Sequence, residues 1–152
     1  MGVISDTHGL LRPEALRALR GSDLIIHAGD VGTPEVLDRL RDVAPTIAVR
    51  GNNDKGAWAA KLPITADIEV GDIRVHVVHE IAHFELDGDA GISVVVSGHS
   101  HRPSAERRDG ILYLNPGSAG PRRFNLPIAV AHLSVSGHRV RSKIVHLDVG
   151  PR

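Results

Sequence analysis

Residues 23–54, DLIIHAGDVGTPEVLDRLRDVAPTIAVRGNND, contain the alternation of elements that decides the fold. An apolar run typical of a buried strand leads into a helix that we expect to begin at Thr33, and a second apolar run follows. The same order of strand and helix precedes this stretch. Residues 1–5 are apolar, and residues 12–21 have the spacing of a helix with Pro13 in its first turn. This strand–helix–strand–helix–strand order predicts parallel strands joined by crossover helices.

The second half of the chain is instead rich in hairpin signals. Gly-Asp at 71–72, Asp-Gly at 109–110 and Ser-Gly at 136–137 each lie between runs of alternating apolar residues. The stretch 80–91 is too short and too broken to predict a helix. We therefore expect an α/β fold in one domain, residues 1–152, with parallel strands in its first half and antiparallel strands in its second.

The composition narrows the kinds of partner and chemistry. Lys and Arg together number 18, as do Asp and Glu, so there is no electrostatic reason to expect nucleic acid or an anionic membrane as a partner. No apolar run approaches the roughly 20 residues that cross a bilayer, and the first residues do not read as a basic and apolar leader, so we expect a cytoplasmic protein. The chain has no cysteine and ten histidines, so a bound metal would need nitrogen and oxygen ligands.

Side chains that bind metal ions follow the predicted strands at the points where the strands end. Asp6 and His8 come after the first apolar run, and His99 and His101 come after the run at 94–96. Three further donors lie between them along the chain, namely Asp30, Asn52 and His79. Since the carboxyl ends of parallel strands meet at one edge of a sheet, we expect these donors to converge. The members of each i, i+2 pair would point to the same side if their backbone were extended.

The number and charge of these donors favour two metal ions. Seven donors are too many for one tetrahedral zinc ion and suit two six-coordinate ions that share a carboxylate. Two divalent ions carry four positive charges, of which Asp6 and Asp30 offset two, so the site stays positive even with a bound hydroxide. Such a site suits phosphate esters, because the ions hold the phosphoryl oxygens and lower the pKa of the attacking water. A structural metal site is more often closed, mononuclear and rich in cysteine.

Six short motifs occur in the order and at the approximate spacing of a known family. They are SDTHG, HAGD, RGNND, VVH, SGHSH and NPGS, and the resemblance extends from Asp6 to the last hairpin. The chain resembles the calcineurin-like metallophosphoesterases, and among them the small single-domain phosphodiesterases of bacteria and archaea. The resemblance implies a four-layer sandwich, in which two mixed β-sheets pack together with helices outside.

The resemblance also implies a ligand set and a reaction. It places Asp6, His8 and His101 on one metal ion, Asn52, His79 and His99 on the other, and Asp30 between the two. The family binds Mn²⁺, Ni²⁺, Fe, Zn²⁺ or Mg²⁺, of which we expect Mn²⁺. The implied reaction is hydrolysis of a phosphate ester by metal-bound hydroxide, with Asp30 and Asn52 catalytic and Asn52 also holding the phosphate.

The chain departs from the family pattern at two places. Asn53 stands where larger members have a histidine, so we expect it to contact substrate but not to donate a proton. The leaving group would take its proton from water, from a catalytic Asp54 or from no residue, which favours activated diesters; Asp54 could instead cap the turn. Glu80 stands where the family usually has glycine and could act as an extra ligand or base, but we expect it to face solvent. His83, in the shortened 80–91 loop, is expected to be exposed, and the short loop to leave the cleft open.

The remaining polar residues are expected to support the site or to lie elsewhere. We expect His27 to orient a metal ligand through a hydrogen bond. The turn of Asn115, Gly117 and Ser118 could support His101 or contact phosphate. Surface or packing positions are expected for His76, His132, His138, His146, Arg122 and Arg123.

Three functions remain open from the sequence. The first is a dinuclear phosphodiesterase for a small-molecule phosphate ester, which is favoured because all seven ligand positions hold the expected residue types. The second is a scaffold or binding module, since the family includes a retromer subunit of this fold that departs from the full ligand set. The third is a phosphomonoesterase or nucleotide pyrophosphatase that uses the same site. Exposed apolar strands in the second sheet could also allow a homodimer.

Overall fold

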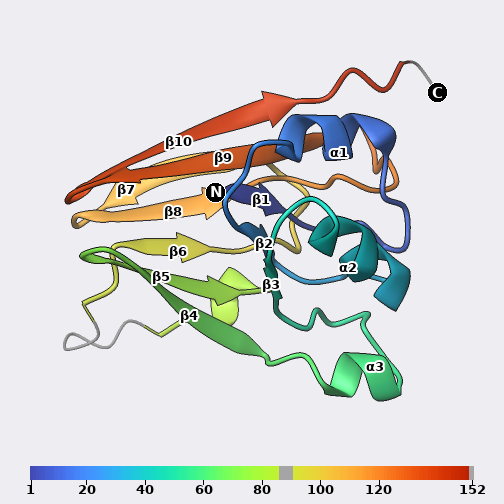
Figure 1. The fold of residues 1–152 in the computed structure, drawn as a ribbon, viewed down its shortest axis with the longest axis horizontal. Helices are drawn as coiled ribbons and strands as arrows, with labels where there is room; N and C mark the ends of the chain where they lie inside the picture. Colours follow the sequence, from blue (N-terminus) through green and yellow to red (C-terminus); the bar gives the residue numbers. More distant parts are fainter. Residues whose placement is uncertain (86–90, 151–152) are drawn as a thin grey trace.

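The computed structural model, which describes residues 1–85 and 91–150, consists of two five-stranded β-sheets packed face to face (Figure 1). The first sheet has the order β10-β9-β1-β2-β3, with bounds β1 Gly2–Ile4, β2 Ile25–His27, β3 Thr46–Ala48, β9 Ala129–Ser136 and β10 Arg139–His146. The second has the order β4-β5-β6-β8-β7, with bounds β4 Thr65–Val70, β5 Ile73–Val78, β6 Val94–Val96, β7 Ser104–Arg108 and β8 Ile111–Asn115. The helices of the described chain are α1 Pro13–Leu19, α2 Pro34–Arg41, α3 Ala57–Ala60 and the 3-10 helix η1 Ile81–His83.

Aliphatic side chains fill the space between the two sheets, because alternate residues of each central strand face it. Val3 of β1 and Ile26 of β2 share one buried cluster with Val75 of β5 and Val94 of β6. The neighbouring Ile4 belongs to a second cluster on the opposite face of the first sheet, which α1 and α2 cover. Burial of β1, β2 and β6 on both faces explains why their apolar runs are unbroken, whereas β5 includes the half-buried Arg74 and His76.

The outer face of the second sheet has a thinner covering among the described residues. Val78 and Val95 form a small buried cluster there with Ile111. Phe84, which follows η1, packs against this cluster, and its ring centroid lies 5.2 Å from that of His76. The expected sandwich of two mixed sheets is confirmed, with α1 and α2 outside the first sheet and the short segment after η1 outside the second.

The pairing of the strands corrects one expectation from the sequence. β1, β2 and β3 are parallel, and the hairpins β4–β5, β7–β8 and β9–β10 are antiparallel, as predicted. However, β5, β6 and β8 also pair in parallel, so the second half is not purely antiparallel. Long connections separate these three strands, and a connection of about a dozen residues or more can return the chain in the same direction. In the last hairpin Ser136 pairs with Arg139, so the turn is Gly137-His138, one residue later than predicted.

The helices that were predicted are present at the expected positions. α1 begins at Pro13, and α2 follows Thr33, although the Thr33 side chain makes no capping hydrogen bond. The short α3 was not predicted, because its sequence AWAA is too short to show a helical spacing. Among the described residues, no helix is long and apolar enough to cross a membrane.

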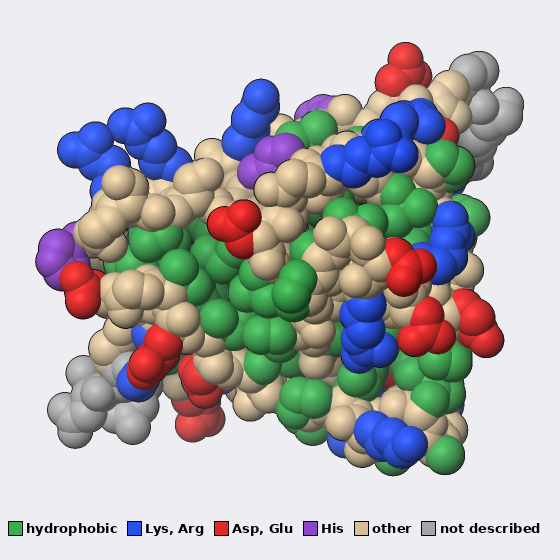
Figure 2. All heavy atoms as spheres, in the orientation of Figure 1, with side chains coloured by type: hydrophobic (Ala, Val, Ile, Leu, Met, Phe, Trp, Pro, Cys, Tyr) green, Lys and Arg blue, Asp and Glu red, His purple; other side chains and the backbone are tan. Residues whose placement is uncertain are grey.

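The outermost strands carry charged side chains. β7 is exposed along its whole length and contains Glu106, Arg107 and Arg108. On the face seen in Figure 2, Lys and Arg side chains lie near the end where the tip of the β9–β10 hairpin is drawn in Figure 1 and at several other places. Charged edge strands discourage pairing with a further strand. The β7 edge therefore does not offer the exposed apolar surface that was expected for a homodimer.

Candidate metal centre

The seven predicted donors lie together beyond the carboxyl ends of β1, β2, β3, β5 and β6. Their ligand atoms form two groups, of which the first is Asp6, His8 and His101 and the second is Asp30, His79 and His99. Asn52 joins the second group, because its Oδ1 is 3.0 Å from His79 Nε2 and 3.2 Å from His99 Nδ1. The structure thus brings all seven residues to one place.

The backbone at most of these donors is left-handed. The φ angles are 55° at Asp6, 47° at His8, 55° at Asp30, 70° at His99 and 63° at His101. The expectation of an extended backbone at the two i, i+2 pairs is therefore wrong. Non-glycine residues in this region cost about 1–3 kcal/mol each and gather at functional sites. Asp6 and His8 enter the same group, whereas His99 and His101 enter different groups.

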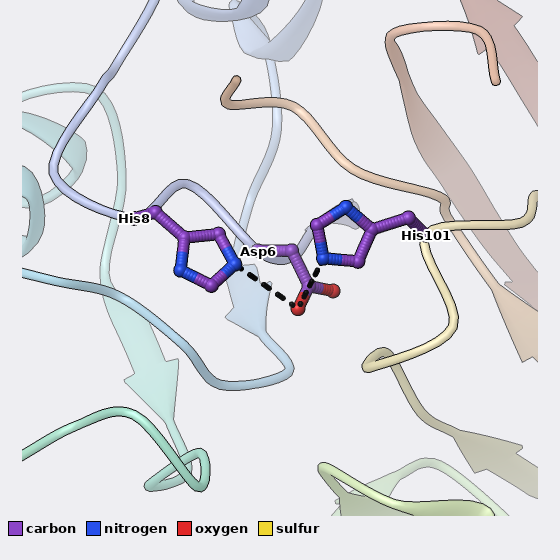
Figure 3. A group of neighbouring side chains, drawn as sticks. All are labelled: Asp6, His8 and His101. Atoms are coloured by element: carbon purple, nitrogen blue, oxygen red, sulfur yellow. Dashed lines mark ion pairs between the residues drawn. The ribbon is translucent and has the colours of Figure 1, made fainter. Parts of the chain in front are cut away.

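The first group is centred on one oxygen of Asp6. Figure 3 shows the imidazoles of His8 and His101 on either side of that oxygen, Oδ1, with their Nε2 atoms 3.8 and 3.4 Å from it. These separations exceed those of good hydrogen bonds. Among the described residues, Asp6 Oδ1 and His8 Nε2 are buried without a hydrogen-bond partner. Buried polar atoms require a partner, and a cation shared by the three side chains would satisfy them, so the group fits a divalent metal ion.

Asp30 lies between the two groups. Its Oδ2 is 3.3 Å from His79 Nε2 in the second group and 3.7 Å from His8 Nε2 in the first. A carboxylate in this position can contact an ion in each group. The outer nitrogen of His79, Nδ1, donates to the carbonyl of Ala28 at 2.7 Å. When the ring is neutral, the lone pair of His79 Nε2 therefore faces the centre of the second group.

The electrostatics of the site favour a cation. Burial alone would raise the pKa of Asp6 and Asp30, but the nearby histidines and hydrogen-bond donors outweigh burial, so both pKa values lie below the usual value. Burial lowers the pKa of His8, although the two aspartates oppose this shift. Burial would also lower the pKa of His79, but its hydrogen bond to Asp30 and the charge of Asp6 raise it. At neutral pH the site holds two carboxylates, and a cation would displace any proton on His79.

Asp54 holds two ligand loops together. Its buried carboxylate accepts hydrogen bonds from the amides of Val31 at 3.2 Å, Gly32 at 2.9 Å and Gly51 at 2.9 Å. Val31 and Gly32 directly follow the predicted ligand Asp30, and Gly51 directly precedes the predicted ligand Asn52. Both oxygens are engaged by the backbone, so the contacts contradict a role as proton donor. They favour the alternative that Asp54 caps the turn.

Asn53 contacts Asp30. Its backbone amide donates to Asp30 Oδ1 at 2.9 Å, and its side-chain Nδ2 donates to Oδ2 at 3.0 Å. These two hydrogen bonds fix the plane of the carboxylate between the two groups. The side chain that was expected to contact substrate is therefore engaged in holding Asp30.

His27 is fully buried and supports the backbone beside two predicted ligands. Its Nδ1 accepts a hydrogen bond from the amide of Gly29 at 3.1 Å, so Nε2 carries the hydrogen and donates to Thr7 Oγ1 at 3.0 Å. Thr7 in turn donates to the carbonyl of Val31 at 2.8 Å. Burial lowers the pKa of His27 to about 4, which agrees with a neutral ring. His27 thus holds the neighbours of ligands, and not a ligand side chain as expected.

Two hydroxyl residues of the site were not predicted from the sequence. Ser5 Oγ donates to Asp6 Oδ2 at 2.7 Å, and the backbone amide of His99 donates to the same oxygen at 3.0 Å. Ser5 and Thr7 are both buried. The available signal was their place in a polar run that directly continues a buried strand, where each hydroxyl group needs a hydrogen-bond partner.

The turn at 115–118 supports the loops of the first group. Asn115 Nδ2 donates to the carbonyl of Gly98 at 3.0 Å, and Ser118 Oγ donates to the carbonyl of Asp6 at 3.0 Å. Gly98 begins the loop that carries the two histidines after β6. These contacts favour the supporting role of the turn over contact with phosphate.

Glu80 is directed toward the second group, so the expectation that it faces solvent is wrong. Its Oε1 lies 3.0 Å from His99 Nε2, its Oε2 lies 3.1 Å from His83 Nε2, and its side chain is 23% exposed. His83 is exposed, as expected. Glu80 and His83 line a cavity of about 250 Å³ beside the second group, with Ile64 on one wall. Part of the shortened loop, residues 86–90, lies outside the described residues.

The other histidines and the paired arginines lie outside the two groups. His76 Nδ1 is 2.9 Å from Asp67 Oδ1 on the neighbouring strand, and His132 Nε2 donates to a main-chain carbonyl of α1 at 2.7 Å. The exposed Arg123 adds to burial in lowering the pKa of His8. Three further side chains have contacts or exposure typical of the surface, namely Arg122, His138 and His146.

Comparisons of sequence agree with this geometry. Residues 1–138 match the model of the calcineurin-like phosphoesterase superfamily domain. The chain is 35% identical to a probable metallophosphoesterase of Methanocaldococcus jannaschii, over 97% of this chain and 81% of that protein. It is 34% identical to the phosphodiesterase YfcE of Escherichia coli, over 75% of this chain and 76% of that protein.

Comparisons of structure show the same fold. Vacuolar Protein Sorting 29 from Cryptosporidium parvum aligns with a TM-score of 0.82 at 18% identity, over 99% of this chain and 92% of that one. An archaeal phosphodiesterase aligns with a TM-score of 0.75 at 23% identity, over 95% of this chain and 98% of that one. At these identities the likeness concerns the fold alone. Because the family match covers residues 1–138, the chain belongs to the calcineurin-like phosphoesterase superfamily.

Proposed function

We propose that this protein is a phosphodiesterase that hydrolyses a small-molecule phosphate ester at a centre of two divalent metal ions. The observation that carries the proposal is the position of Asp30 between two groups of metal-binding side chains. A structural metal site would need only one of these groups. The superfamily, and relatives named metallophosphoesterase and phosphodiesterase, support the same chemistry.

The two groups would each hold one ion. The first ion would be held by Asp6, His8 and His101, the second by Asn52, His79 and His99, and Asp30 would contact both. We propose Mn²⁺ for both positions, with Ni²⁺, Fe, Zn²⁺ and Mg²⁺ as alternatives, because nitrogen and oxygen donors accommodate all of these ions. When bound, such ions supply positive charge for the phosphoryl oxygens and a water molecule of lowered pKa.

Asn52 would bind the phosphoryl group. Its Oδ1 faces the rings of His79 and His99, while the residue itself is exposed. The Nδ2 group on the other side of the carboxamide would donate a hydrogen bond to a phosphoryl oxygen. Asn52 and the bridging Asp30 are therefore the two residues to which we assign a catalytic role.

The leaving group would receive little help from the protein. Asp54 is bound to three backbone amides, and Asn53 is bound to Asp30. Neither residue can supply a proton at the site, so the departing oxygen must be stable as an anion or be protonated by water. This favours activated diesters, such as aryl phosphodiesters, over alkyl monoesters.

The proposal is tested by stripping the protein of metal and refilling it with each candidate ion in turn. We expect an aryl phosphodiester to be cleaved faster than an aryl phosphomonoester with at least one ion. Asp30→Asn should lower kcat by about 1000-fold or more without unfolding the chain. Hydrolysis of neither ester with any ion would contradict the proposal and favour the scaffold alternative. Faster cleavage of the monoester would instead identify a phosphomonoesterase.

A further inference from the structure

We infer that Glu80 is a positioning residue that turns the lone pair of His99 toward the second metal ion. Its carboxylate accepts a hydrogen bond from Nε2 of His99, which leaves Nδ1 as the nitrogen that can bind a cation. The inference rests on the two-metal centre proposed above, because it concerns a ligand of the second group.

The ring of His99 lies between two oxygen atoms. Glu80 Oε1 is 3.0 Å from Nε2, and Asn52 Oδ1 is 3.2 Å from Nδ1. A neutral imidazole carries one hydrogen, and a carboxylate can only accept it. Since a carboxylate is the stronger acceptor of the two oxygens, the hydrogen lies on Nε2. The lone pair of Nδ1 is then directed toward the second group.

His79 shows the same arrangement within the same group. Its Nδ1 donates to the carbonyl of Ala28 at 2.7 Å, while its Nε2 lies 3.3 Å from Asp30 Oδ2. In metal sites, an oxygen acceptor on the outer nitrogen of a histidine ligand fixes the tautomer and the orientation of the ring. The main chain supplies this acceptor for His79, and the side chain of Glu80 supplies it for His99.

His99 depends on such a contact more than His79 does. The side chain of His99 is 45% exposed, whereas that of His79 is 5% exposed, so packing holds the ring of His79 but not that of His99. The backbone amide of His99 donates to Asp6 Oδ2 at 3.0 Å, which fixes its main chain but not its ring. Without an acceptor at Nε2, an exposed imidazole can change both its rotamer and its tautomer.

Glu80 is itself held from two sides. It directly follows His79 at the end of β5, and its Oε2 is 3.1 Å from Nε2 of His83 on η1. The backbone amide of His83 donates to the carbonyl of Glu80 at 3.0 Å, so the two residues belong to one turn. His83 steadies one oxygen of the carboxylate while the other faces His99.

Calorimetric titration of the metal-free protein with Mn²⁺ tests the inference without an activity assay. We expect the wild-type protein to bind two ions, and Glu80→Ala to weaken one of them about 10–100-fold while leaving the other unchanged. Glu80→Gln should restore part of the loss, because the carboxamide oxygen can still accept from His99. Glu106→Ala is the matched control, since it removes an exposed carboxylate on β7 that belongs to neither group and should change both affinities by less than about threefold.

Several results would overturn the inference. Unchanged affinity for both ions in Glu80→Ala would do so, as would an equal loss of both. The inference would also be overturned if Glu80→Gln bound the weakened ion no more tightly than Glu80→Ala does. That result would indicate that Glu80 binds the ion directly. If the variants behave as expected and no phosphate ester is hydrolysed, the proposed function fails and the role of Glu80 stands. A wild-type protein that binds fewer than two ions overturns the inference whatever its hydrolytic activity.

Discussion

Replacing Asp54 with asparagine should destabilise the fold rather than remove a proton donor. In the structure, Oδ2 accepts from the amides of Val31 and Gly51, and Oδ1 accepts from the amide of Gly32. Asparagine keeps one acceptor oxygen, so at least one buried amide would face an NH2 group. An unpaired buried donor costs about 1–3 kcal/mol, and each remaining bond weakens by about 1 kcal/mol when the acceptor loses its charge. We therefore expect a loss of about 3–5 kcal/mol in the free energy of unfolding.

Urea denaturation of the metal-free protein measures this loss as a lower midpoint at unchanged slope. Asp38→Asn is the matched control, because the Asp38 side chain is 74% exposed on α2 and its replacement should alter the free energy of unfolding by less than about 0.5 kcal/mol. If Asp54 were a proton donor, its replacement would instead slow hydrolysis without lowering the free energy of unfolding. The reasoning is refuted if Asp54→Asn unfolds at the wild-type urea concentration but hydrolyses a phosphodiester about 100-fold more slowly.

Two further predictions concern His27 and Glu80. The folded pKa of His27, about 4, lies below the ordinary value of 6.5, so the unfolded chain takes up a proton that the buried ring does not. The stability from this residue is complete above about pH 6.5 and falls by about 3 kcal/mol as the pH drops to about 4. The urea midpoint should fall over this pH range in the wild type and fall less in His27→Gln. If the midpoints of the two proteins changed equally with pH, the lowered pKa of His27 would be refuted. Glu80→Gln removes a negative charge beside the second group, so at saturating metal it should favour doubly charged monoesters over singly charged diesters. We expect the ratio of kcat/KM for an aryl monoester to that for an aryl diester to rise about 3–10-fold at low salt, whereas an unchanged or lower ratio would show that the charge of Glu80 is not felt by the substrate.

The convergence of the donors could be predicted in part from the sequence, because the donors of one sheet are brought together by strand direction. Asp6 and Asp30 follow the parallel strands β1 and β2 of the first sheet within three residues, and the carboxyl ends of such strands meet at one sheet edge. His79 follows β5 of the second sheet, so its approach to them also depends on the packing of the two sheets. The hairpins were predictable because each has a glycine at its tip, which favours a local turn. In contrast, the parallel pairing of β5, β6 and β8 depends on contacts between distant parts of the chain.

The roles of side chains within the loops were harder to predict. Glu80 and Asp54 could have faced either solvent or the site, and only the path of the backbone after the strand decides between these directions. The left-handed φ angles at His99 and His101 likewise reverse the side-chain direction that an extended strand would give. Such backbone angles result from the packing of several loops together, and no single motif in the sequence specifies them.

An anomalous-difference map from crystals of the Mn²⁺-loaded protein tests the central claim most directly. The account predicts two peaks, one among Asp6, His8 and His101 and the other among the donors of the second group, with the carboxylate of Asp30 in contact with both. A map with one peak, or with none between these side chains, would contradict it.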